Sequence, residues 1–332
     1  MSKVPADPAL TRSLDALGKT VREHPHENPE KPKTAPPAKV VQLPLWPEAG
    51  RGVPNSILRG ALFAAVQGKG RRYMKREILA SQRGITIRFT GMQLDQSDLD
   101  VWEQALHLAR QHPLGTRCNF TARGFLRALG RSTGKSDHEW LKEAFARLVG
   151  CAVEITHGHR TYFGCLVEGG VRDERTGRYV LEINPKIANL STATHWTAVD
   201  WEQRQRLRGK PLALWLQGFY ASHAEPYSLS VEYLHRLSGS RTKALWKFKQ
   251  NLAQALRDLK TSRAIHSFVI ENGLVHVVAV PSKSQEKHSR KQKPRESGDR
   301  LGAGTGYEVE SPFPKTKKLK YYQMVTRIPK IP

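Results

Sequence analysis

The middle of this sequence carries the same succession of segments twice, and this repeat constrains the fold more than any other feature. Each copy reads as a helix, a short extended piece, a capped helix, a tight turn, a longer helix and then strands. The segments of the first copy are, in order, residues 96–111, 117–120, 121–130, 136–148, 152–157, 161–169 and 178–185. Those of the second copy are residues 211–223, 227–229, 230–239, 243–260, 264–270 and 274–280.

The spacing of the cap and turn residues agrees between the two copies. Thr121 in the first copy and Ser230 in the second are suited to cap a helix. Gly130 and Gly239, nine residues further on in each copy, are suited to end it. A winged helix is a helix-turn-helix with a hairpin appended, and its order is helix, short strand, helix, turn, helix and hairpin. The sequence therefore predicts an α+β fold with two tandem winged-helix domains.

The turn of the first copy has some of the residues of a phosphate-binding loop. Residues 130–136 read GRSTGKS, but the loop pattern G-x-x-x-x-G-K-[ST] would require a glycine in place of Leu129. Such a loop also follows a buried strand, whereas a predicted helix precedes this turn. We therefore predict that Gly130 ends one helix and that Ser136 caps the next.

The charge of the chain limits its partners. Lys and Arg number 54 against 30 Asp and Glu, a net charge of +24 that favours a polyanion such as nucleic acid or an anionic membrane surface. The three cysteines, Cys118, Cys151 and Cys165, have no C-x-x-C spacing, which favours a reducing compartment over a disulfide scaffold. The sequence shows neither a signal-peptide pattern nor an apolar run of about 18 residues. We therefore expect a soluble cytoplasmic protein, without a cofactor.

The two ends differ in composition from the patterned middle. Residues 1–41 are rich in Pro, Lys and Glu and poor in large apolar residues, which predicts a disordered arm. Residues 283–332 are weakly hydrophobic and basic, which predicts a flexible tail. Between these ends, the first winged helix is expected over residues 53–190 and the second over residues 191–282.

The long helix of the second copy has the composition expected of a helix that reads DNA. With Leu252 toward the core, a step of about 100° per residue turns cations and glutamines outward. Lys and Arg suit phosphates and guanine, and Gln suits adenine, although an ordinary solvated face is the alternative. The predicted core face is Leu245, Phe248, Leu252, Leu256 and Leu259. The hairpin that follows has Asn-Gly in its turn and is the predicted wing. The predicted DNA-binding residues of the helix, its entrance and this wing are Arg241, Thr242, Lys243, Lys247, Gln250, Gln254, Arg257 and Asn272.

The corresponding helix of the first copy lacks this character. With Leu141 toward the core, its outward face presents Glu139 and Glu143, which phosphates repel. Lys135, Lys142 and Arg147 could still touch the DNA backbone. We therefore expect the second winged helix to read sequence, and the first to mediate dimerisation, non-specific DNA contacts or both.

A second chemical pattern lies at residues 157–162. His157 and His159 flank Gly158 near Tyr162, as in the metal site and catalytic tyrosine of rolling-circle nickases. Two histidines with one residue between them point the same way on a strand, so metal binding is one interpretation. Gly158 cannot supply the bulky apolar residue of that motif, and no third ligand is evident, so the tip of a hairpin is favoured. No catalytic residues, metal ligands or enzymatic activity are therefore predicted.

From about residue 42 to about residue 280 the sequence resembles the TrfA family of iteron-binding plasmid replication initiators. The residues that carry this resemblance are 46–63 (WPEAGRGVPNSILRGALF), 85–94 (ITIRFTGMQL) and 222–229 (SHAEPYSL). The resemblance implies a protein that binds direct repeats, or iterons, at a plasmid origin and promotes opening of adjacent A·T-rich DNA. It also implies recruitment of the host helicase and initiator, contact with single-stranded origin DNA, and a monomer–dimer equilibrium that limits copy number.

A short peptide within residues 42–52, before the first domain, carries a further expectation of the resemblance. QLPLW (Gln42, Leu43, Pro44, Leu45 and Trp46) is similar to the Q-L-[SD]-L-F peptide that docks on the bacterial sliding clamp. Its Pro-rich lead-in favours the extended form that docking requires. In the alternative interpretation, Leu43, Leu45 and Trp46 pack on their own domain.

These observations together predict a plasmid replication initiator. The first alternative is a winged-helix transcriptional regulator or partition protein, which would bind promoters or partition sites and would not need the clamp-like peptide. The second is a rolling-circle nickase that uses the histidines and the tyrosine of residues 157–162.

Overall fold

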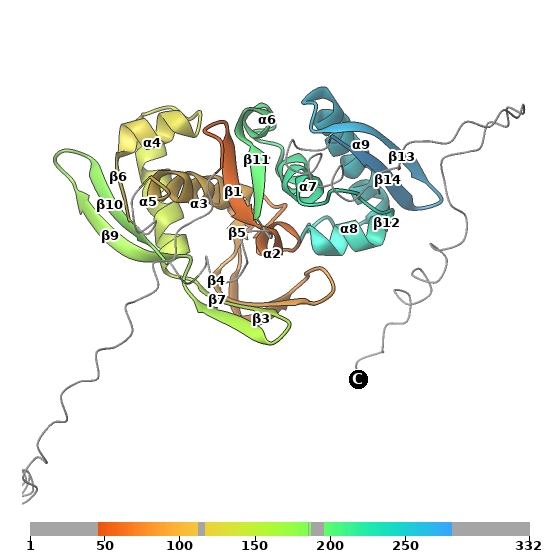
Figure 1. The fold of residues 1–332 in the computed structure, drawn as a ribbon, viewed down its shortest axis with the longest axis horizontal. Helices are drawn as coiled ribbons and strands as arrows, with labels where there is room; N and C mark the ends of the chain where they lie inside the picture. The colour runs from red at the N-terminus through yellow and green to blue at the C-terminus, as the bar shows by residue number, and fades with distance from the viewer. Residues whose placement is uncertain (1–45, 112–116, 185, 187–195, 281–332) are drawn as a thin grey trace, which may run out of the picture. The chain divides into compact units, whose positions relative to one another are not determined.

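In the computed structural model, the two copies of the repeat have sheets of the same strand order (Figure 1). The structure describes residues 46–111, 117–184, 186 and 196–280. Residues 96–183, the first repeat, contain α3 (Gln96–Ala109), β6 (Arg117–Thr121), α4 (Ala122–Ala128), α5 (Lys135–Val149), β7 (Ala152–His157), β8 (Arg160–Gly164), β9 (Val167–Asp173) and β10 (Arg178–Ile183). Residues 211–279, the second repeat, contain α7 (Pro211–Ala221), β12 (Leu229–Ser230), α8 (Val231–Leu237), α9 (Leu245–Thr261), β13 (Ile265–Glu271) and β14 (Leu274–Ala279).

The short strand of each repeat pairs with the last strand of the following hairpin. The antiparallel sheet of the first repeat has the order β6-β10-β9, and that of the second has the order β12-β14-β13. The predicted order of helix, short strand, helix, helix and hairpin is therefore present in the second repeat, whereas in the first repeat β7 and β8 lie between α5 and the β9–β10 hairpin.

Two side chains cap helices as the sequence predicts. The Thr121 hydroxyl accepts a hydrogen bond from the backbone N–H of Gly124 at 3.2 Å. The Ser230 hydroxyl accepts one from the backbone N–H of Tyr233 at 3.1 Å. Each bond satisfies a donor that the first turn of a helix otherwise leaves unpaired, which fixes where α4 and α8 begin.

The turns after these helices also match. Gly130 has a φ of 66° and Gly239 a φ of 63°, a left-handed conformation that glycine adopts at little cost. The predicted cap at Ser136 is wrong, because α5 begins one residue earlier, at Lys135, which places Ser136 inside the first turn. The capping position is occupied by Gly134, which has no side chain to accept a hydrogen bond.

The strands that follow α5 do not all belong to one sheet. β7 and β8 join β3 (Tyr73–Leu79) and β4 (Ile85–Met92) in a four-stranded antiparallel sheet of order β3-β4-β7-β8. The single strand predicted over residues 161–169 is wrong, because β8 ends at Gly164 and β9 begins at Val167 in another sheet. Alternation of apolar residues indicates a strand but does not specify the strand with which it pairs.

A pair of strands from distant parts of the chain lies between the two repeats. β1 (Gly50–Pro54) pairs antiparallel with β11 (Trp196–Asp200). Figure 1 shows this pair between α3 and α7. β2 (Phe63–Ala64) pairs parallel with β5 (Leu94–Asp95). The other short elements outside the two repeats are α2 (Asn55–Leu58), the 3-10 turn η1 (Gly68–Gly70) and α6 (Trp201–Arg206). Both repeats therefore belong to one compact unit.

Residues around α2 hydrogen-bond directly to the second repeat. The indole N–H of Trp215 donates to the carbonyl of Gly60 at 3.0 Å. The backbone N–H of Ala65 donates to the carbonyl of Ser238 at 2.7 Å, next to the turn between α8 and α9. The segment that precedes the first repeat thus supports the turn of the second.

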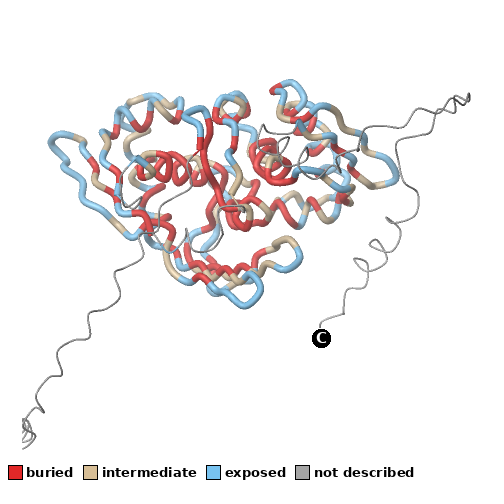
Figure 2. The backbone as a smooth tube through the Cα atoms, in the orientation of Figure 1, coloured by how far each residue is buried: buried red, intermediate tan, exposed pale blue. Residues whose placement is uncertain are grey.

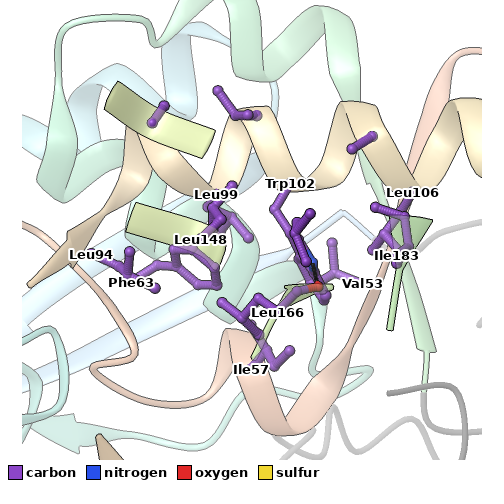
Figure 3. Close-up of a cluster of buried hydrophobic side chains, with 14 of the residues drawn as sticks. Val53, Ile57, Phe63, Leu94, Leu99, Trp102, Leu106, Leu148, Leu166 and Ile183 are labelled. Atoms are coloured by element: carbon purple, nitrogen blue, oxygen red, sulfur yellow. Dashed lines mark hydrogen bonds between the residues drawn. The ribbon is translucent and has the colours of Figure 1, made fainter. Parts of the chain in front are cut away.

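Two clusters of buried apolar side chains form the core. One surrounds α3, where Trp102 is fully buried and its indole N–H donates to the carbonyl of Leu166 at 3.2 Å. Figure 3 shows Trp102 with Leu99 and Leu106 of the same helix. The other cluster lies among α7, α8, α9 and their hairpin. α3 and α7 accordingly run through the buried part of the chain (Figure 2).

One buried cation joins the two repeats. Arg204 on α6 is 1% exposed. Its guanidinium contacts the Asp100 carboxylate, lies 3.3 Å from Glu103 Oε2, and donates to Gln96 Oε1 at 3.1 Å, all on α3. It also donates to the carbonyl of Leu214 on α7 at 3.3 Å. Burial raises the pKa of Asp100 and raises that of Glu103 to about 7, whereas the charge of Arg204 opposes both shifts.

Candidate nucleic-acid interface

The helix α9 buries one face and exposes the other. Its buried residues are Phe248, Leu252, Ala255, Leu256 and Leu259. Leu245, which the sequence places on the core face, is 37% exposed, so that expectation is wrong. It lies in the first turn of α9, beyond the buried row that begins at Phe248. The helix itself begins at Leu245, not at Lys243.

The predicted DNA-binding residues lie on the exposed side of the second repeat. Arg241, Thr242 and Lys243 precede α9, and Thr242 is half-buried whereas the two cations are exposed. The exposed side chains on the helix are Lys247, Gln250, Gln254 and Arg257. Asn272 is exposed at the turn between β13 and β14 and has a φ of 48°. The structure thus brings seven of these residues to α9 and its entrance, and places Asn272 at the hairpin.

The cations of this surface have no carboxylate partners in the described part of the chain. There, no ion pair is formed by Arg241, Lys243, Lys247, Lys249 or Arg257. Arg257 donates to Gln254 Oε1 at 3.0 Å, and Lys247 lies 3.4 Å from Gln250 Oε1. The anion Asp258 accepts from Lys210 at 2.8 Å. The exposed face of α9 is therefore positive and free to meet an anionic ligand.

The corresponding helix of the first repeat, α5, has a mixed face. Glu139 and Glu143 are exposed, as predicted. Lys142 pairs with Glu139 at 3.0 Å. Arg147 pairs at 2.8 Å with Asp98, whose side chain is fully buried, so the expectation that Arg147 touches DNA is not supported by its position. A cation held by a buried carboxylate is costly to withdraw.

Neither the loop-like residues 130–136 nor the nickase-like residues 157–162 have the surroundings that a phosphate-binding loop or a nickase site requires. The turn at Gly130 follows the helix α4, not a buried strand, so it lacks the context of a phosphate-binding loop. Gly158 lies at the tip of the β7–β8 hairpin with a φ of 59°. Tyr162 is buried, its hydroxyl donates to the carbonyl of Cys165, and burial raises its pKa. In the ranges that the structure describes, no group of three or more His, Cys, Asp and Glu side chains is placed to hold a metal ion.

The clamp-like peptide lies mostly outside the described residues. Gln42, Leu43 and Leu45 belong to that undescribed part. The side chain of Trp46 is buried: its indole N–H lies 3.2 Å from His107 Nδ1, and its ring stacks on Trp196 with centroids 6.0 Å apart. Trp46 therefore adopts the packed alternative in this conformation.

The family model described as TrfA protein matches residues 37–279. The chain belongs to the TrfA family. The match to this family includes both repeats and ends with β14, so the predicted basic tail lies outside it. It also includes all the residues predicted to bind DNA or the sliding clamp.

One relative agrees with this membership of the TrfA family. The plasmid replication initiator protein TrfA of Escherichia coli is 28% identical over 251 residues, which cover 72% of this chain and 65% of that protein. A crystal structure of RctB domains 2–3 is similar with a TM-score of 0.46, 13% identity, and coverage of 70% of this chain and 99% of that one. A crystal structure of Pi initiator protein in complex with iteron DNA has a TM-score of 0.39, 13% identity, and coverage of 55% and 95%.

Two exposed residues of α9 in this TrfA-family chain are not indicated as DNA-binding by the sequence pattern. Lys249 is exposed beside the predicted cations. Trp246 is 66% exposed in the first turn of α9. The helical step places Trp246 away from the core, but an aromatic residue on a helix is ordinarily assigned to packing.

In the described residues, no helix is long and apolar enough to cross a bilayer.

Proposed function

We propose that this chain is a plasmid replication initiator that binds direct repeats at a plasmid origin. Each repeat of the fold acts as a winged helix, and α9 of the second repeat enters the major groove. The observation that carries the proposal is the exposed face of α9, whose cations have no carboxylate partner in the described residues, in a chain of the TrfA family. Cations on that face bind phosphates, and Gln250 and Gln254 meet base edges.

The two repeats have different roles in this proposal, and the second repeat reads the DNA sequence. The first repeat carries exposed carboxylates on α5, so it contributes protein–protein contacts in a monomer–dimer equilibrium and non-specific DNA contacts. After binding the repeats, the protein promotes opening of adjacent A·T-rich DNA, contacts the exposed single strand, and directs the host initiator and replicative helicase to the origin. These later steps rest on family membership and on the similarity to the initiator from Escherichia coli.

Origin binding is expected to depend steeply on salt. If Arg241, Lys243, Lys247, Lys249 and Arg257 each neutralise a phosphate, the logarithm of the binding constant should fall against the logarithm of salt concentration with a slope of about −4 or steeper. A gel-shift series on an origin-repeat duplex measures this slope.

Supplying the chain in trans should let an origin fragment replicate, and failure of both experiments would contradict the proposed function.

Clamp binding is expected to be separable from DNA binding. A double substitution, Gln42→Ala with Leu43→Ala, should abolish retention on an immobilised sliding clamp and leave the affinity for repeat DNA unchanged. The reason is that the peptide docks on the clamp through its own side chains, whereas the residues proposed to bind DNA are others, in α9, at its entrance and in the β13–β14 turn. Trp46→Ala shows the effect of lost packing for comparison. Removing this buried tryptophan should lower the free energy of unfolding by about 3–5 kcal/mol. Loss of both activities in the double variant would instead indicate that the peptide packs on its own domain.

A further inference from the structure

The first turn of α9 exposes an indole on an otherwise polar reading face. Trp246 is the second residue of the helix and is 66% exposed. Neighbouring Leu245 is 37% exposed. Within the described residues, the indole N–H has no hydrogen-bond partner and the ring has no aromatic or cation partner. Its apolar surface is therefore open to a ligand.

The position of Trp246 places it with the residues proposed to read bases. Gln250 lies four residues further along the helix, so the two side chains are neighbours on one face. The core residue Phe248 points the opposite way and is fully buried. The N-terminal residues of a recognition helix are the ones that reach base edges, and Trp246 lies nearer to the N-terminus of α9 than Gln250 does.

The charges around Trp246 select a polyanionic partner. Lys243, Lys247 and Lys249 are exposed within three residues of it, and the first turn of α9 contains no acidic residue. A protein surface would have to be strongly acidic to approach this ring, whereas duplex DNA supplies phosphates on both sides of the groove. In the major groove, the apolar group of the bases is the C5-methyl of thymine.

We infer that Trp246 contacts thymine methyl groups and thereby requires an A·T pair at the position read by the start of α9. This inference rests on the proposed function, because it assigns base specificity to the same helix. Gln250 complements the contact, because its amide suits the N6 and N7 atoms of adenine on the same or the adjacent pair.

The test removes methyl groups one at a time. Each thymine of a duplex with a single origin repeat is replaced singly by deoxyuridine, which lacks only the C5-methyl, and affinities are measured for the full chain and its Trp246→Ala variant. The unsubstituted chain should bind about fourfold more weakly at one or two positions, the value for withdrawing one methyl-sized group from an apolar contact. Trp246→Ala should lose affinity for the intact repeat and show no further loss at those positions.

The matched control is Phe163→Ala, which truncates an aromatic residue that is 76% exposed on β8, in the first repeat. It should retain the sensitivity of the unsubstituted chain to methyl removal. The inference is overturned if the unsubstituted chain binds every deoxyuridine duplex equally. It is also overturned if Trp246→Ala keeps the same sensitivities, or if that variant is impaired only on DNA with two or more repeats, which would indicate a contact between bound copies. Preference for the repeat over scrambled DNA would survive these results, so the proposed function is judged separately.

Discussion

Arg204→Ala is expected to lower the free energy of unfolding by about 3–5 kcal/mol, because it leaves two carboxylates without their buried cation. Arg204 is 1% exposed and contacts Asp100 and Glu103 on α3, while it also donates to Leu214 on α7. Its loss therefore weakens the first repeat, the second repeat and their junction together. Thermal unfolding should show a melting temperature lower by roughly 10 °C.

The control for this substitution lies two residues away on the same helix. Arg206 is exposed and pairs with the exposed Glu202, so Arg206→Ala should change stability by less than about 1 kcal/mol. Similar losses in the two variants would show that Arg204 does not join the repeats through a buried charge.

The effect of Arg204→Ala should also depend on pH. The pKa of Glu103 is about 7 in the folded protein against 4.5 for an ordinary glutamate, so the folded state binds its proton more tightly and stability falls as pH rises between these values. Removing Arg204 takes away the charge that lowers the pKa of both Glu103 and Asp100, which makes ionisation of the buried carboxyls costlier still. Urea unfolding should show a larger loss at pH 8 than at pH 5, and equal losses would contradict this account.

The local features of the fold could be predicted because each depends on a few adjacent residues. The caps at Thr121 and Ser230 and the turns at Gly130 and Gly239 are determined by side-chain hydrogen bonds and backbone freedom. The sheet β3-β4-β7-β8 and the β1–β11 pair could not be predicted in the same way. Strands contacting across long stretches of chain are selected by tertiary packing, which the alternation of apolar residues does not encode.

The exposed face of the candidate site could be predicted for the same reason. The helical period alone turns Lys247, Gln250 and Gln254 away from Leu252. The same period places Leu245 on the core face although it is 37% exposed, because the period does not show where a core ends. The carboxylate partner of Arg147 lies on another helix, α3, so its pairing with Asp98 required the tertiary structure.

The double substitution of Lys247 and Gln250 by alanine is expected to reduce discrimination between repeat and scrambled DNA by tenfold or more, about 1.4 kcal/mol or above. A well-placed polar contact to a base contributes about 1–3 kcal/mol to such discrimination. Both side chains are exposed and pack on nothing in the core, so the fold should be unaffected. Non-specific affinity should fall less, because the other cations of α9 still neutralise phosphates.

The ratio of two dissociation constants shows most directly whether α9 reads the sequence of the origin repeat. One is measured on a single-repeat duplex and the other on a scrambled duplex of equal length and composition, at one salt concentration. The unsubstituted chain and Glu143→Ala, which changes the exposed face of α5, should both strongly prefer the repeat. The Lys247→Ala/Gln250→Ala variant should show a preference for the repeat that is at least about tenfold smaller. A double variant that keeps the full preference, or a Glu143→Ala variant that loses as much, would contradict the claim.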